Sequence, residues 1–131
     1  MSEIITDKLT GRATANDVTV TVGATATQSL EQGLCKSFAV YGEDTVVDNS
    51  LNIASLTDVA TGATDHNYTN DFSSAESYTV AIASIPGTDV AERPRVSVAY
   101  SNSTRTINEE VDTSTDRDAD QFYFSTFGDL A

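Results

Sequence analysis

Residues 121–127 read QFYFSTF, and this stretch decides the fold because its apolar side chains alternate with the period of a β-strand. In such a strand Phe122 and Phe124 share one face, while Tyr123 and Phe127 share the other. A strand with aromatic side chains on both faces needs cover on both sides. We therefore expect it to lie either at the centre of a sandwich within one chain or between the domain core and a neighbouring subunit.

The same period of two recurs along the chain, whereas helical periodicity is scarce. Clusters of turn-forming residues separate the alternating stretches at the spacing of a sandwich or barrel, and they are GEDT, TDVATGATDHN, PGTDVAERP and NEEVDTSTDRDAD. The sequence therefore predicts an all-β fold, an antiparallel β-sandwich or jelly-roll-like domain with a short N-terminal strand segment. The expected strands are residues 17–23, 34–42, 49–57, 77–85, 95–100 and 121–127.

The N-terminal part of the chain differs from the rest. Its first 26 residues contain one short valine-rich strand and no aromatic residue, so they offer little apolar area for a core of their own. In residues 27–34, TQSLEQGL, the spacing of Ser29 and Gln32 is that of a capping box, which predicts a helical turn acting as a hinge. We expect residues 1–30 to form an attachment or oligomerisation segment and residues 31–131 to form the β-sandwich domain.

The charge of the chain excludes several classes of partner. Twenty Asp and Glu face seven Lys and Arg, which gives a net charge of -13. Such a field repels phosphate and anionic lipid, so we expect neither nucleic acid nor a membrane as a partner. The acidity favours adaptation to high salt over a general solubility charge, because Asp outnumbers Glu and Arg outnumbers Lys.

Two further classes of protein are not expected. The chain has no run of eighteen apolar residues, and its start lacks the basic and apolar regions of a secretory signal. Cys35 is the single cysteine, so a disulfide-stabilised scaffold is excluded, and we expect a small buried thiol.

Candidates for chemistry are few. His66 is the single histidine and follows Asp65, but no serine has the glycine flanks of a nucleophile elbow, and a core histidine is the favoured interpretation. The acidic stretch at residues 112–120 lacks the glycine and distal glutamate of a calcium loop and carries Arg117 at its centre, so a solvated loop is favoured over a metal site. We expect no enzyme activity, no cofactor and no metal. The acidic side chains of that stretch are Asp112, Asp116, Asp118 and Asp120.

Asn67 and Asn102 each begin an Asn-X-Ser/Thr pattern, which is the acceptor for N-glycosylation. The pattern arises often by chance in a chain so rich in serine and threonine. Modification of either residue therefore stays open.

The chain resembles the fibre-like structural proteins of tailed viruses along nearly its whole length. The opening MSEIITDKLTGRATANDVTVT is similar to their N-termini, with a Met-Ser lead, a Lys-x-x-x-Gly stretch and a small strand. The Gln-Gly-Leu-x-Lys-x-aromatic strand, the Asp-Asn-Ser-Leu-Asn strand, the Tyr-Thr strand and the closing FGDLA follow in the same order. Together with the acidity, the resemblance implies a protein of a tailed virus whose host is a halophilic archaeon.

This resemblance implies a virion structural protein, either a capsid decoration or turret or a tail-fibre-like subunit. Such proteins are usually homotrimers, so the implied partners are further copies of the chain, the major capsid or tail protein and a host-surface glycan or protein. The implied location is the surface of the particle, after assembly in the host cytoplasm. The residues expected at the subunit interface are Val18, Val20, Val22, Tyr123 and Phe127.

A free carbohydrate-binding or adhesive β-sandwich module is the alternative function. Sugar-binding sites expose aromatic rings on loops, because a ring must stack on the face of the sugar. Nine of the ten aromatic residues lie in or beside expected strands, and Phe72 is the main exception. The distribution of aromatic residues therefore favours the structural role.

Overall fold

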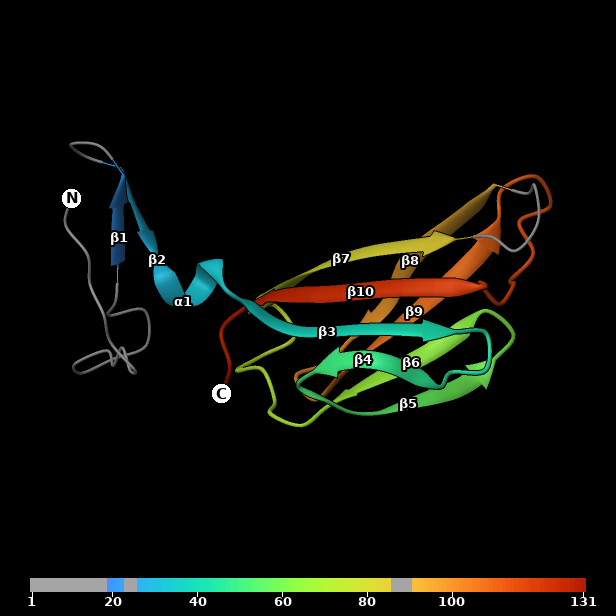
Figure 1. Ribbon diagram of the computed structural model, residues 1–131, viewed down its shortest axis with the longest axis horizontal. Coiled ribbons are helices and arrows are strands. Elements are labelled where there is room, and N and C mark those ends of the chain that lie inside the picture. Colours follow the sequence, from blue (N-terminus) through green and yellow to red (C-terminus); the bar gives the residue numbers. More distant parts are fainter. Residues whose placement is uncertain (1–18, 23–25, 86–90) are drawn as a thin grey trace.

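The computed structural model shows two four-stranded antiparallel sheets packed as a sandwich (Figure 1). The structure describes residues 19–22, 26–85 and 91–131. The first sheet contains, in spatial order, β4 (Val47–Leu51), β3 (Cys35–Gly42), β10 (Gln121–Gly128) and β7 (Tyr78–Ile85). The second contains β5 (Ile53–Ala60), β6 (Ala63–Tyr68), β9 (Ser103–Glu110) and β8 (Glu92–Ala99). The predicted all-β sandwich is confirmed.

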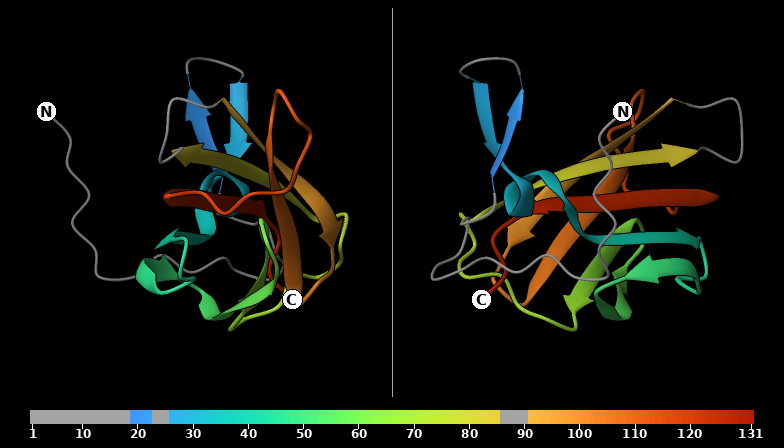
Figure 2. Two further views of the ribbon diagram at one scale, coloured as in Figure 1. Left: turned by 90° about the vertical axis from the view of Figure 1, so that its right-hand side faces the viewer. Right: turned by 60° about the vertical axis from the view of Figure 1, so that its left-hand side comes forward.

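A short two-stranded ribbon precedes the sandwich. In it β1 (Thr19–Val22) pairs antiparallel with β2 (Ala26–Ser29), and the helix α1 (Leu30–Gly33) leads from the ribbon to β3. The helical turn expected within residues 27–34 is confirmed, while β2 adds to the predicted strands. The ribbon lies beyond the end of the sandwich (Figures 1 and 2). Within the described part of the chain, no helix has the length and apolarity needed to cross a membrane.

One expected strand, residues 49–57, is divided between the two sheets. The extended conformation is interrupted at Asn52, whose backbone adopts a left-handed φ of 55°. β4 therefore ends in the first sheet and β5 begins in the second. The Asn52 side chain holds this corner: its Oδ1 accepts from the Asn70 backbone N–H at 2.7 Å, and its Nδ2 donates to the Asn70 carbonyl at 3.0 Å. Asparagine tolerates a positive φ better than most residues, which explains the position of the break.

Two strands lie where the sequence predicts turns. β6 occupies part of the cluster TDVATGATDHN, and β9 reaches into the start of NEEVDTSTDRDAD. Both strands alternate with period two, but their buried positions carry mainly threonine, histidine and asparagine in place of large apolar residues. The apolar pattern that marks a strand in sequence is therefore weak. The inward-facing residues are Thr64, His66, Tyr68, Thr104, Thr106 and Asn108.

The centre of the core is a stack of rings contributed by both sheets. The Phe124 ring lies parallel to the His66 ring, with 4.0 Å between their centroids and 13° between their planes. Beside it the Tyr41 and Phe122 rings stack at 5.3 Å. Burial of each aromatic side chain contributes about 2–3 kcal/mol to the free energy of unfolding, so these contacts join the sheets strongly.

Phe72 belongs to this core, although the sequence places it in a loop. Its side chain is almost fully buried, stacks on Tyr78 at 4.2 Å and meets the edge of Tyr68 at 4.9 Å. A backbone bridge to Leu130 brings the loop to the end of the chain. Phe72 therefore closes one end of the sandwich and is not an exposed ring for a ligand.

Gly62, in the turn between β5 and β6, should not tolerate a side chain. Its φ is 72°, and a Cβ atom there would lie 2.6 Å from the Arg117 nitrogen and 2.7 Å from the Asn108 oxygen of the backbone. We expect Gly62→Ala to lower the free energy of unfolding by about 2–3 kcal/mol, as measured by urea denaturation. The matched control is Gly42→Ala, where the nearest atom would be 3.4 Å away, and this variant should unfold within about 1 kcal/mol of the native protein. Equal effects of both substitutions would contradict this account.

Candidate functional site

The first sheet is almost free of charge. Its three longest strands, β3, β10 and β7, carry no Asp or Glu, and Lys36 is the single charged residue among them. The chain as a whole has twenty acidic residues, so this sheet stands apart from the rest of the molecule. Charge-depleted areas on a protein surface are characteristic of the centres of interfaces.

The outer side of this sheet is also apolar. Tyr123 lies at its centre, paired with Val40 of β3 on one side and with Ala83 of β7 on the other. The next row across the sheet runs from Leu51 through Phe38, Ser125 and Ala81. We call this surface the apolar face, and it comprises Phe38, Val40, Leu51, Ala81, Ala83, Ile85, Tyr123 and Phe127.

Much of the apolar face is open to water in a single chain. Leu51 and Ile85 are each 47% exposed, and Tyr123 is 37% exposed. A hollow of about 350 Å³ lies over the centre of the sheet. The larger side chains of Phe38, Val40 and Tyr123 stand on one side of it and the small side chains of Ala81 and Ala83 on the other. An exposed apolar surface with a hollow of this kind is suited to contact with another protein.

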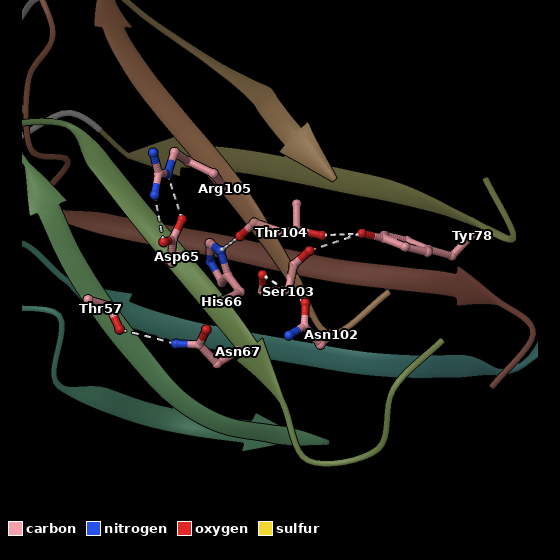
Figure 3. A network of polar contacts seen from close by, with 9 residues as sticks. All are labelled: Thr57, Asp65, His66, Asn67, Tyr78, Asn102, Ser103, Thr104 and Arg105. Carbon is pink, nitrogen blue, oxygen red and sulfur yellow. Dashed lines mark hydrogen bonds and ion pairs between the residues drawn. The ribbon is translucent and has the colours of Figure 1, made fainter. Parts of the chain in front are cut away.

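The outer side of the second sheet is polar and its charges are paired. The Glu109 carboxylate accepts from the guanidinium groups of Arg93 and Arg95, each at 2.7 Å. Asp65 forms a two-pronged ion pair with Arg105, with N–O distances of 2.7 and 2.8 Å (Figure 3). These guanidinium groups hold the pKa of the Glu109 and Asp65 carboxyls below their usual values. Because the arginine side chains of these pairs are 38–56% exposed, the pairs contribute little to stability and mark this side as solvated.

Tyr123 and Phe127 both point outward on β10, as predicted, and they belong to the apolar face. A β-bulge separates Thr126 from Phe127 in the pairing with β3, and Phe127 pairs with Cys35 beyond it. The thiol of Cys35 is half-buried rather than fully buried, and it donates to the Ser37 carbonyl at 3.1 Å. Tyr123 and Phe127 therefore share the outer side of the first sheet.

The valines expected at the interface are separate from these aromatic residues in a single chain. Val20 is 44% exposed on β1. Val22 lies on the same strand, and Val18 lies outside the described residues. The structure therefore places Val20 and Val22 on β1, outside the sheet that holds Tyr123 and Phe127.

His66 lies inside the sandwich, not at a surface site. Its Nδ1 donates to the Thr104 carbonyl at 3.2 Å, and no partner for Nε2 lies among the described residues (Figure 3). Burial lowers the pKa of His66 to about 4, although the carbonyl and the Asp65 charge favour its protonated form. Asp65 is the neighbour of His66 on the strand, so its carboxylate points to the opposite side, toward Arg105. The imidazole and the carboxylate are thus not arranged as a catalytic pair.

A network of hydroxyl groups closes the end of the sandwich near His66. The Thr104 hydroxyl lies 2.6 Å from the hydroxyl of Tyr68 and 2.6 Å from that of Tyr78. Tyr78 also donates to the Tyr100 carbonyl at 2.9 Å. The buried Thr104 hydroxyl of the second sheet therefore finds its partners in two tyrosines of the core.

The acidic stretch at residues 112–120 forms an exposed connection between β9 and β10. One of its carboxylates has a structural role, because Asp118 Oδ1 accepts from the Gly62 backbone N–H at 2.6 Å. Over the described residues, no three side chains of His, Cys, Asp or Glu are grouped as a metal site requires.

The two glycosylation patterns differ in their surroundings. Asn67 lies within β6, where its Nδ2 donates to the Thr57 hydroxyl at 3.1 Å (Figure 3). It also donates to the Ser55 hydroxyl at 3.1 Å. Asn102 is exposed in the connection between β8 and β9. Neither residue belongs to the apolar face.

Most residues of the apolar face escape the sequence-based prediction, which identifies only Tyr123 and Phe127. A signal was present in the stretches SFAVYG (37–42) and TVAIASI (79–85), where apolar residues occupy consecutive positions and not only alternate ones. Such continuous runs indicate strands that are covered on both faces. The need for cover on both faces, inferred for QFYFSTF, therefore extends to β3 and β7, its neighbours in the sheet.

Comparisons with protein-family models, with curated proteins and with solved structures found no match to this chain.

Stability should fall in mild acid because His66 is buried in its neutral form. Above pH 6.5 the imidazole is neutral in both the folded and the unfolded state; as the pH falls toward 4, the unfolded state binds a proton that the folded state does not. By pH 4.5 this difference removes about 3 kcal/mol from the free energy of unfolding. His66→Phe retains a ring against Phe124, and His66→Leu does not. Between pH 7.5 and 4.5 each variant should lose less free energy of unfolding than the native protein, as measured by urea denaturation. If the free energy of unfolding had the same pH dependence in the native protein and in both variants, this role of His66 would be refuted.

Salt should stabilise the isolated chain. Screening of the repulsion among surface carboxylates predicts a melting temperature that rises by several degrees between about 0.1 and 2 M KCl at pH 7.5. The control is the same series near the sequence pI of about 4.1, where fewer carboxylates are charged and the increment should shrink. A melting temperature that stays constant at pH 7.5 would remove the argument for a high-salt origin.

Proposed function

We propose that this chain is a non-enzymatic structural subunit that assembles with further copies of itself through the apolar face. Its specific role in this proposal is that of a capsid decoration, turret or tail-fibre-like subunit of a tailed virus. The observation that carries the proposal is the contrast between the two sides of the sandwich. One side has paired charges, while the other has apolar side chains and, on β3, β7 and β10, no acidic residue.

A second copy of the chain fits the charge of this surface. Two molecules of net charge -13 repel one another over most approaches. Contact through the apolar face places no carboxylate of these three strands against another. Self-association is thus favoured where the apolar gain is largest and the electrostatic penalty is smallest.

The dimensions of the face approach those of a specific contact. Strands β3, β7 and β10 have eight residues each and β4 has five, so the sheet covers about 450 Å². Covering this area on two surfaces buries about 900 Å², close to the lower limit of about 1,000 Å² for a specific interface. A homotrimer, as the resemblance to virus fibres implies, can bury these surfaces around a common axis.

The place of the subunit in a particle follows from its resemblance to tailed-virus fibre proteins. In this proposal residues 1–30 attach to the major capsid or tail protein, and the sandwich projects from the particle surface toward the host. The location is the virion, after assembly in the host cytoplasm.

A free carbohydrate-binding or adhesive module is the second candidate, because Tyr123 presents a ring beside the hollow. Its hydroxyl donates to Gln121 Oε1 at 2.8 Å. The side-chain polar groups lining the hollow are the hydroxyls of Tyr123 and Ser125 alone. Sugar sites supply several converging polar groups, so an apolar protein partner fits this lining better.

The oligomeric state of Tyr123→Asp tests the proposal. We expect the native chain in about 2 M KCl to sediment as a trimer and Tyr123→Asp to sediment as a monomer with unchanged circular dichroism. An unpaired carboxylate at an apolar contact costs about 3 kcal/mol, which weakens association roughly a hundredfold.

Two variants control this experiment. Tyr100→Asp carries the same substitution at a tyrosine that is 55% exposed outside the apolar face, and it should remain a trimer. Phe124→Asp places the carboxylate in the core and should unfold the domain. A native chain that is monomeric at tens of micromolar would overturn the proposal, as would a Tyr123→Asp variant that still assembles.

A further inference from the structure

The β1–β2 ribbon lacks the support that a two-stranded unit needs. Among the described strands, β1 pairs with β2 alone and β2 with β1 alone. An isolated two-stranded ribbon is marginally stable in water and needs a third strand or a packing surface. The ribbon is joined to the sandwich through α1 and stands beyond its end (Figures 1 and 2). The described strands of the sandwich therefore give the ribbon no pairing partner.

The ribbon is also a second charge-free segment of the chain. Residues 18–30 include no Asp, Glu, Lys or Arg, although charged residues make up 21% of the sequence. β1 alternates threonine with valine, and Val20 is largely open to solvent. The ribbon and the apolar face thus share a lack of charge, and Val20 and Tyr123 are both exposed in one copy.

We propose that the β1–β2 ribbon of one copy packs on the apolar face of a neighbouring copy, over the hollow above β10 and β7. This inference rests on the proposed self-assembly and names the segment that covers the face. A two-stranded ribbon is about 10 Å wide, which matches the width of β10 and β7 side by side. The small outward side chains of Ala81 and Ala83 leave room there for the valine side of β1.

Contact between copies follows from the position of the ribbon. α1 and Leu34 hold it at the end of the sheet where β3 begins (Figure 1). On the apolar face of the same chain, Tyr123 and Ile85 are exposed. A contact between different surfaces of neighbouring subunits closes into a ring when the rotation permits. The ribbon-to-face contact is therefore compatible with a homotrimer.

Cross-linking between two differently marked chains tests the inference. Both chains carry Cys35→Ser, which removes the single native thiol; one chain has Val20→Cys and the other has Ala83→Cys and a size tag. The chains are unfolded, mixed, refolded in about 2 M KCl and treated with a short bismaleimide. We expect a covalent product of one tagged and one untagged chain. Thr57→Cys, on an exposed position of β5, replaces Ala83→Cys in the control mixture and should give at least tenfold less product.

The outcomes separate this inference from the function on which it rests. A product formed only between two Val20→Cys chains would show that ribbons contact ribbons. A cross-link within a single diluted chain that carries both Val20→Cys and Ala83→Cys would show that each ribbon covers the apolar face of its own chain. Either result overturns the inference, and so does the absence of any product from an intact trimer. Monomeric Cys35→Ser chains, together with a monomeric native chain, would instead refute self-assembly itself. As a second measurement, Val20→Asp should weaken association at least tenfold without altering the sandwich by circular dichroism.

Discussion

The contact between the Phe124 and His66 rings joins the two sheets, and the rest of the structure depends on it. Phe124 lies on β10 at the centre of the first sheet, and His66 lies on β6 at the centre of the second. Their close parallel stacking requires a neutral imidazole, because a charged ring without solvent or a counter-ion is strongly disfavoured in this position. The low pKa of His66 is therefore a consequence of how the sheets are held together.

The two sheets contribute different kinds of side chain to this core. The first sheet contributes mainly phenylalanine and tyrosine rings, whereas the second contributes Tyr68 together with threonine, histidine and asparagine. Buried hydroxyls require partners, and the tyrosines of the core provide them, as in the contacts of Thr104 with Tyr68 and Tyr78. Specific pairing of this sort favours one arrangement of the sheets over others, since a shifted register would leave buried hydroxyls without partners.

The two sheets also differ in the side chains on their outer faces, and this difference connects the fold to the proposed function. The second sheet faces solvent with ion pairs such as Asp65 with Arg105, which keep a highly acidic protein hydrated. The first sheet keeps its outer side apolar on strands that are also apolar inside. A strand with both faces apolar is stable in water only when both are covered, and the sandwich covers one. In the proposed function, assembly with further copies provides the second cover, and the β1–β2 ribbon packs on a neighbouring copy for the same reason.

The sequence by itself determined the all-β class, the helical turn near residue 30 and the opposite orientations of Phe124 and Tyr123, because each of these depends on local periodicity or local capping. It also predicted that the QFYFSTF strand would need cover on both sides. Tertiary structure alone decided that β6 and β9 are core strands, since buried Thr106 and Asn108 have no apolar signature and are placed by pairing and hydrogen bonds. It alone decided that Asn52 turns the chain from one sheet to the other. The apolar face also required the tertiary structure, because Phe38, Ala83 and Tyr123 come from strands far apart in the sequence, and only long-range pairing brings them into one row of side chains.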